Sequence, residues 1–113
     1  MSDTNNDVIF SLYKDQPIYR DLLQDFVSCL EERLALSRKA FENKSWKDLS
    51  GLMHQLRGAA ATYGFPALAA IAGTIELDAA NPSVEPVKIA SSIDAISLTC
   101  RKIEAGMALL PAL

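Results

Sequence analysis

The chain has 113 residues, a hydrophobic share of 50% and a formal charge of −3 at pH 7. A chain of this length can bury about two-thirds of its unfolded surface, so we expect one domain over residues 1–113 whose core needs no metal or disulfide. The acidic charge argues against general nucleic-acid binding, which needs a basic surface. No apolar run approaches the roughly 20 residues of a membrane-spanning helix, and the polar start is not a signal peptide, so we expect a cytoplasmic protein.

The first part of the chain predicts a short apolar segment followed by a long helix. Residues 8–13 are too few to fold alone and predict a lid or an extra turn. Asp15 as N-cap and Pro17 in the first turn start the long helix, which runs to about Asn43. Its apolar positions repeat every three or four residues and include Tyr19, Leu22, Leu23, Phe26, Leu30 and Leu34.

A second helix is predicted from about Trp46 to Tyr63. Ser45 is a favourable N-cap, with Asp48 three residues later in a capping-box arrangement. Gly64 followed by Pro66 is typical of a C-terminal stop. One face of this helix is apolar and must turn to a core: Trp46, Leu49, Met53, Leu56, Ala60 and Tyr63.

Two more helices follow. Pro66 suits the first turn of the third helix, whose inward residues are Leu68, Ile71, Ala72 and Ile75, and which the dipeptide Asn81-Pro82 ends. Ser83 as N-cap and Pro86 in the first turn start the last helix, with an apolar stripe of Ile89, Ile93, Ile96, Cys100, Ile103, Met107 and Leu110. Cys29 and Cys100 have no metal-ligand or redox spacing and should both be reduced, small hydrophobes.

Short connections join antiparallel neighbours, and the chain shows no strand alternation. We therefore expect an all-α fold: an antiparallel, up-down-up-down four-helix bundle with a short N-terminal extra segment or helix.

His54 is the only histidine of the chain. If its segment is helical, the residues one or two turns away on the same face are Gly51, Gly58 and Ala61, which are all small. The apolar stripe lies on roughly the opposite face. We interpret this pattern as an exposed imidazole on a rigid helix, which is typical of a functional site.

The string His54-Gln55-Leu56-Arg57-Gly58, with Ala60, Ala61, Tyr63-Gly64-Phe65, Leu68 and Ile75-Glu76 after it, resembles the histidine-containing phosphotransfer (HPt) domain of bacterial phosphorelays. It is equally similar to the phosphoacceptor domain of chemotaxis histidine kinases. The similarity covers about residues 45–76, and the flanking helices match only in length and pattern. The family most often has Lys where this chain has Arg57, which keeps the charge and is a good partner for phosphoryl oxygens.

The resemblance implies that His54 accepts a phosphoryl group from an aspartyl phosphate and passes it to another aspartate. Arg57 would contact the phosphoryl oxygens. Gly58 would leave room for the phosphoryl group and the docking protein, although a glycine here also suits close packing of a neighbouring helix. Four residues would contribute at the periphery: Gly51, Ala61, Lys47 and Gln55.

The sequence lacks a Gly-rich phosphate loop, a kinase-type lysine and an acidic triad for Mg²⁺. One histidine without nearby cysteines or acidic ligands makes no convincing zinc site. A Ser or Cys hydrolase is not indicated either, because the sequence has no second histidine and no oxyanion motif. We expect a phosphoryl carrier that is not an enzyme and has no cofactor or metal of its own. The resemblance places Mg²⁺ and the aspartate in the partner's receiver domain.

The partners implied are response-regulator receiver domains and a hybrid sensor histidine kinase, bound by a monomer. A receiver would dock over the His54 face and the long helix near residues 26–34, or near Phe10 and Leu12; core packing competes as an interpretation, more for Phe26 and Leu30 than for Phe10. The termini favour a stand-alone carrier. Two alternatives stay open: a phosphoacceptor domain of a chemotaxis-type kinase, and a helical adaptor that binds receivers without carrying phosphate.

Overall fold

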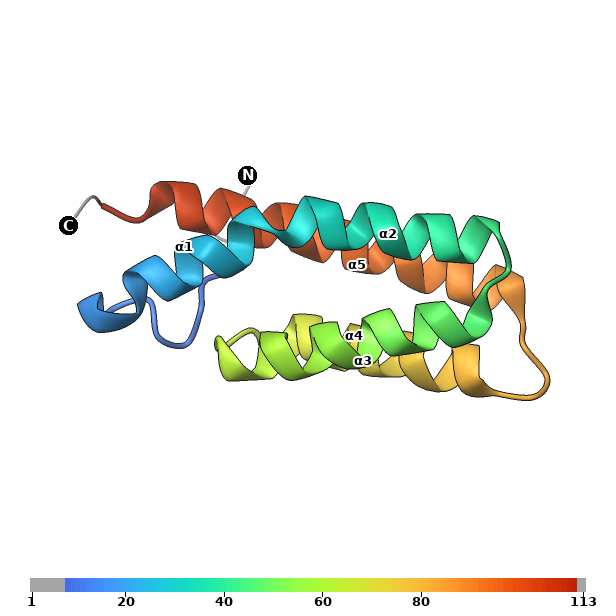
Figure 1. Ribbon diagram of the computed structural model, residues 1–113. Helices are drawn as coiled ribbons and strands as arrows, with labels where there is room; N and C mark the ends of the chain where they lie inside the picture. The colour runs from blue at the N-terminus through green and yellow to red at the C-terminus, as the bar shows by residue number, and fades with distance from the viewer. Residues whose placement is uncertain (1–7, 112–113) are drawn as a thin grey trace.

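The computed structural model describes residues 8–111, which form helices and no strand. The elements are the 3-10 turn η2 (Pro17–Tyr19) and the helices α1 (Arg20–Ser28), α2 (Leu30–Glu42), α3 (Trp46–Thr62), α4 (Pro66–Ala80) and α5 (Pro86–Leu109). The helix α3 packs between α2 and α4, and α5 packs on α4, α2 and α1. In Figure 1, α1 and α2 follow each other as one bent rod. The α3–α4 turn lies at one end of the bundle, and the α2–α3 and α4–α5 connections lie at the other. The prediction of an all-helical four-helix bundle is confirmed.

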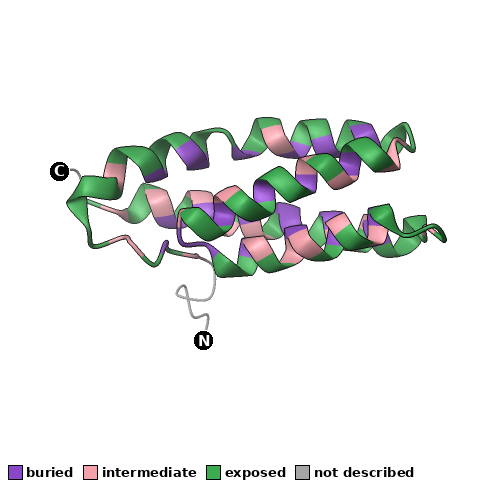
Figure 2. Cartoon of the chain, turned by 60° about the horizontal axis from the view of Figure 1, so that its bottom comes forward, coloured by how far each residue is buried: buried purple, intermediate pink, exposed green. Residues whose placement is uncertain are grey.

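The core consists of apolar side chains from each of the five α-helices. Figure 2 shows buried positions recurring along the helices, as the three- and four-residue spacing predicts. Among the most deeply buried are Leu23, Leu30, Leu49, Leu56, Leu68, Ile75, Ile89 and Ile96. Across residues 8–111, every helix falls short of the length or the apolar character that a bilayer crossing demands.

The start of the predicted long helix differs from the structure. A single 3-10 turn with Gln16 at its N-cap comes first, and Pro17 occupies its first turn. Asp15 is therefore not an N-cap; its carboxylate pairs with Lys14 Nζ at 3.1 Å on the surface.

A break at Cys29 divides the predicted long helix into α1 and α2. Tyr19 and Leu22 are exposed, contrary to the prediction, whereas α1 buries Leu23, Phe26 and Val27. The Tyr19 and Leu22 side chains line a hollow next to Tyr63, where α1 extends past the end of α3 (Figure 1), so α3 covers them only in part. Cys29 is exposed at the break and does not pack as a small hydrophobe, whereas Cys100 is buried in the core.

The helix α3 begins at Trp46 as predicted and ends at Thr62, one residue early. Ser45 occupies its N-cap position, but the hydroxyl makes no capping hydrogen bond, so the predicted capping box with Asp48 is not formed.

The helix α4 agrees with the prediction, with Pro66 in its first turn and Asn81 at its C-cap. The N-cap predicted for α5 is wrong, because Glu85 occupies that position. Instead, the Ser83 N–H donates to Asn81 Oδ1 at 2.8 Å, and this side-chain turn delays the helix. The helix α5 ends at Leu109, so Leu110 lies just beyond it.

Residues 8–13 form a strap and not a helix. The Ile9 N–H donates to the Lys102 carbonyl of α5, and the Leu12 N–H donates to the Gly64 carbonyl, both at 2.9 Å. The Ser11 hydroxyl donates to the Tyr63 carbonyl at 2.6 Å. Gly64 has a φ of +83°, which favours glycine. The strap thus ties α5 to the α3–α4 turn, in agreement with the predicted N-terminal extra segment.

Candidate functional site

The imidazole of His54 projects from the exposed face of α3, and 64% of its side chain is exposed to solvent. Gly51, Gly58 and Ala61 on the same face are exposed as well. A Cβ atom added at Gly51 or at Gly58 would meet nothing within 4 Å. The surface around the ring is therefore open helix backbone, accessible to a second protein.

One carboxylate of α4 holds the imidazole and the guanidinium of α3 together. Glu76 Oε2 lies 2.8 Å from His54 Nδ1, and Arg57 Nε donates to Glu76 Oε1 at 2.8 Å. His54 and Arg57 are three residues apart, which places both side chains on the same side of α3. Because α4 packs along α3, a single glutamate reaches both of them.

This geometry determines which ring nitrogen carries the proton when His54 is neutral. An ionised carboxylate only accepts hydrogen bonds, so Nδ1 must donate to Glu76 Oε2. A bare Nδ1 would instead direct its lone pair at the carboxylate. Arg57 Nη2, at 3.2 Å from Nδ1, then lies beside the ring without donating to it. The Nε2 nitrogen keeps its lone pair.

The ion pair between Arg57 and Glu76 makes the Glu76 carboxyl more acidic. The hydrogen bond from Arg57, above all, holds the pKa of the Glu76 carboxyl below its ordinary value of 4.5, and the bond with His54 adds to this effect against partial desolvation. The carboxylate is therefore ionised at neutral pH, ready to accept the Nδ1 proton. Because its pKa is lowered in the folded state, its contribution to stability is present above 4.5 and is lost as the pH falls through the folded value.

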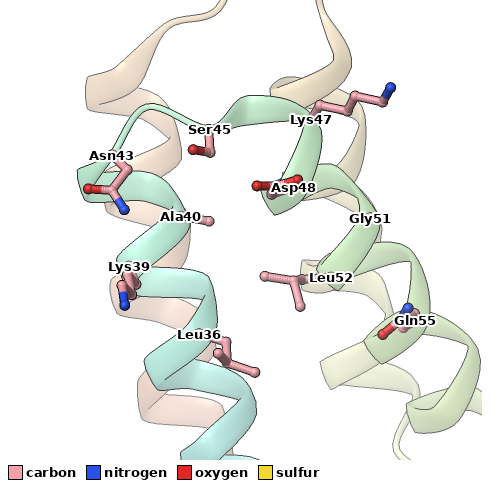
Figure 3. A pocket seen from close by; sticks show the side chains of 10 residues that line it. All are labelled: Leu36, Lys39, Ala40, Asn43, Ser45, Lys47, Asp48, Gly51, Leu52 and Gln55. Carbon is pink, nitrogen blue, oxygen red and sulfur yellow. The ribbon is translucent and has the colours of Figure 1, made fainter.

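A groove of about 540 Å³ runs between α2 and α3 beside the His54 face (Figure 3). Leu36 of α2 and Leu52 of α3 point into it from opposite sides, and Lys39 and Asp48 lie near its edges. Its lining ends at Gln55, the residue that follows His54. The groove thus continues the open surface of α3 as an apolar strip with a charged rim.

The other predicted residues fall around this surface. Gly51, Lys47 and Gln55 line the groove. Phe26 and Leu30 are buried in the core, as the interpretation of core packing expects for these two residues. Leu34 is buried as well, so the predicted docking stretch is wrong at that residue, whereas Phe10 and Leu12 of the strap are exposed.

The sequence alone predicts no role for Glu76, although this residue belongs to the motif that resembles the HPt domain. Its position on a separate helix, 22 residues after His54, offers no local signal. A register between α3 and α4 is needed to see that the two side chains meet. Within residues 8–111, His, Cys, Asp and Glu side chains form no group of three that could hold a metal ion.

Replacing Glu76 with Ala should change the tautomer of His54, because the acceptor for the Nδ1 proton is lost. The neutral ring should shift from a dominant Nδ1–H form towards the Nε2–H form, measured by the ring ¹⁵N signals, which report on one residue since the chain has a single histidine. The variant should also unfold at a lower temperature at neutral pH, with a deficit that shrinks as the pH falls below 4.5.

Glu104→Ala on α5 is the control for removing a glutamate, and it should leave the ring signals of His54 unchanged. Equal tautomer populations in wild type and Glu76→Ala would contradict the assignment of the proton to Nδ1.

The model of the Hpt domain family matches residues 21–106, from the first turn of α1 to near the end of α5. No curated protein and no solved structure matches the chain. Hpt domains carry phosphoryl groups on histidine in phosphorelays, and they interact with the receiver domains and kinases of two-component systems. The family match spans more than half of the sequence and includes the whole of α3 and α4, and the chain therefore belongs to the Hpt domain family.

Proposed function

We propose that His54 is the phosphoacceptor of a carrier that takes a phosphoryl group from the aspartyl phosphate of a hybrid histidine kinase and passes it to the aspartate of a response regulator. The observation that supports this most is the Nδ1 contact with Glu76 at 2.8 Å, which leaves the Nε2 lone pair free on an exposed ring. A histidine acts as a nucleophile only when such a lone pair is accessible.

The transfer step follows from this arrangement. The Nε2 lone pair of His54 attacks phosphorus, the P–N bond forms, and the P–O bond to the aspartate breaks, so that the aspartate leaves as a carboxylate with the electron pair. The imidazole gains positive charge as the bond forms. Glu76 accepts a hydrogen bond from Nδ1 and stabilises that charge without having to reorganise. The reverse step delivers the group to the next aspartate.

Arg57 supplies positive charge next to the ring. Its bond to Glu76 uses one N–H of a guanidinium that has five, so other donors remain for the phosphoryl oxygens. The side chain therefore has two roles in our proposal: it holds Glu76 against Nδ1, and it offsets the charge of the phosphoryl group.

Gly58 gives clearance to the partner. A glycine inside a helix costs about 1 kcal/mol relative to alanine, yet a Cβ at Gly58 or Gly51 would meet nothing within the described chain. Packing of a neighbouring helix therefore does not require either glycine. We infer that the bare backbone serves a docking protein, with Ala61, Lys47 and Gln55 at the periphery of the contact.

The partner that fits this surface is a receiver domain. Its aspartyl phosphate must come within bonding reach of Nε2, so the two proteins must meet over the exposed face of α3. The groove between α2 and α3 extends this face with apolar area at Leu36 and Leu52, and Lys39 and Lys47 complement a negatively charged phosphoryl site.

We further propose that residues 1–113 form one monomeric, cytoplasmic domain of a bacterial phosphorelay. Its helices would form an antiparallel up-down-up-down bundle, which the alternating ends of the connections in Figure 1 support.

His54→Gln tests the transfer. Wild-type protein incubated with a ³²P-labelled, phosphorylated receiver domain should take up the label, and the variant should take up none while keeping its helical circular dichroism spectrum. Equal binding of the receiver by both proteins without any label would contradict the proposal and favour the adaptor. Label that comes only from an ATP-binding kinase domain, and never from a receiver, would favour the chemotaxis-type domain.

Leu36→Asp tests the docking groove. This exposed leucine should lose apolar contact with the receiver and raise the concentration that half-saturates transfer on the order of tenfold, while the maximal rate changes little. Leu98→Asp on α5 is the matched control, because the two leucines are 50% and 51% exposed. Neither variant should change the unfolding temperature much. The same half-saturating concentration for both variants would rule out the groove.

A further inference from the structure

A third glycine of the two helices at the site lies under the side chain of Arg57. Gly73 is on α4, one turn before Glu76. A Cβ added to Gly73 would lie 3.0 Å from Arg57 Cδ and 4.0 Å from Arg57 Nε. Gly51 and Gly58 of α3 differ, because a Cβ there would touch nothing.

This contact is closer than an ordinary van der Waals contact between carbon atoms. A methyl group at Gly73 would therefore push the Arg57 side chain away by a few tenths of an ångström. The atom next to Cδ is Nε, which donates to Glu76 Oε1 at 2.8 Å. A displacement of this side chain is therefore transmitted directly to the hydrogen bond that holds the carboxylate.

We propose that Gly73 is a positioning residue for phosphotransfer. Because Gly73 has no Cβ, the Arg57 side chain can cross α4 at this position and hold Glu76 against His54 Nδ1. This inference rests on the proposed function of His54. It accounts for a glycine in the interior of a helix, where alanine would give a more stable helix.

The space at Gly73 matters because Glu76 reaches His54 from a separate helix, α4. Arg57 and His54 share one carboxylate, with one oxygen for each side chain. If Arg57 moves, the carboxylate loses the partner on Oε1 and can turn away from the ring. The proton on Nδ1 then loses its acceptor. It is no longer held on Nδ1, and the ring can adopt the Nε2–H tautomer, in which Nε2 has no free lone pair.

Gly73→Ala tests the proposal with two readouts. The unfolding temperature should stay equal or rise, because the helix propensity of alanine offsets the small loss from weakening an ion pair whose Arg57 side chain is 46% exposed. The ring ¹⁵N signals of the single histidine should nevertheless shift towards the Nε2–H tautomer, and the initial rate of transfer from a phosphorylated receiver domain should fall on the order of tenfold, since small displacements at a reacting group are costly. A gain in stability with a loss of transfer would not arise from a purely structural role.

Two further variants serve as controls. Gly51→Ala makes the same change on α3 without touching Arg57 and should leave the ring signals unchanged. In the Arg57→Ala background, Gly73→Ala should have no further effect on the ring signals or on transfer, because the side chain that a Cβ at Gly73 would displace is absent.

Unchanged ring signals in Gly73→Ala, or an equal effect of this change with and without Arg57, would overturn the proposal. If wild-type protein accepted no phosphoryl group, the proposed function would fail, whereas the ring signals would still decide whether Gly73 positions Arg57.

Discussion

The site depends on one interaction, the bridge that Glu76 makes between His54 and Arg57. A carboxylate between an imidazole and a guanidinium has one oxygen for each, and here both distances are 2.8 Å. The bridge orients the ring, assigns its proton to Nδ1 and lowers the pKa of the carboxyl itself. An exposed histidine without this partner would rotate freely and would share its proton between both nitrogens. Exposure makes the ring accessible, and the bridge makes it a directed nucleophile.

The rest of the fold keeps α3 and α4 in the register that the bridge requires. Small residues in the core, such as Ala60 of α3 and Ala72 of α4, let the two helices approach closely. A tight turn at Gly64 joins them, and the strap closes over it through the Ser11 hydroxyl. Phe26 of α1 stacks on Tyr63 and Phe65 at this turn, with ring centroids 5.0 and 5.8 Å apart. The strap and the aromatic side chains thus hold the α3–α4 turn in place.

The sequence predicts much of this fold because its signals are local. Apolar spacing places the buried face of α3 opposite His54, and Pro66 and Pro86 lie in the first turns of their helices as expected. The failures concern interactions that spacing does not contain. The break at Cys29 interrupts a continuous apolar pattern, and Ser45 and Ser83 have favourable capping chemistry that the structure does not use. Glu76 required the register of two helices, and Gly73 required the path of one side chain across its neighbour.

We propose that Nε2 of His54 is the reacting atom because Glu76 engages Nδ1. The most direct measurement is the identification of the phosphorylated ring nitrogen, by the coupling between ³¹P and ¹⁵N in protein labelled at its single histidine. We expect coupling to Nε2 alone, with a proton still bound to Nδ1. A phosphoryl group on Nδ1 would contradict this proposal, because that nitrogen faces the carboxylate in the structure.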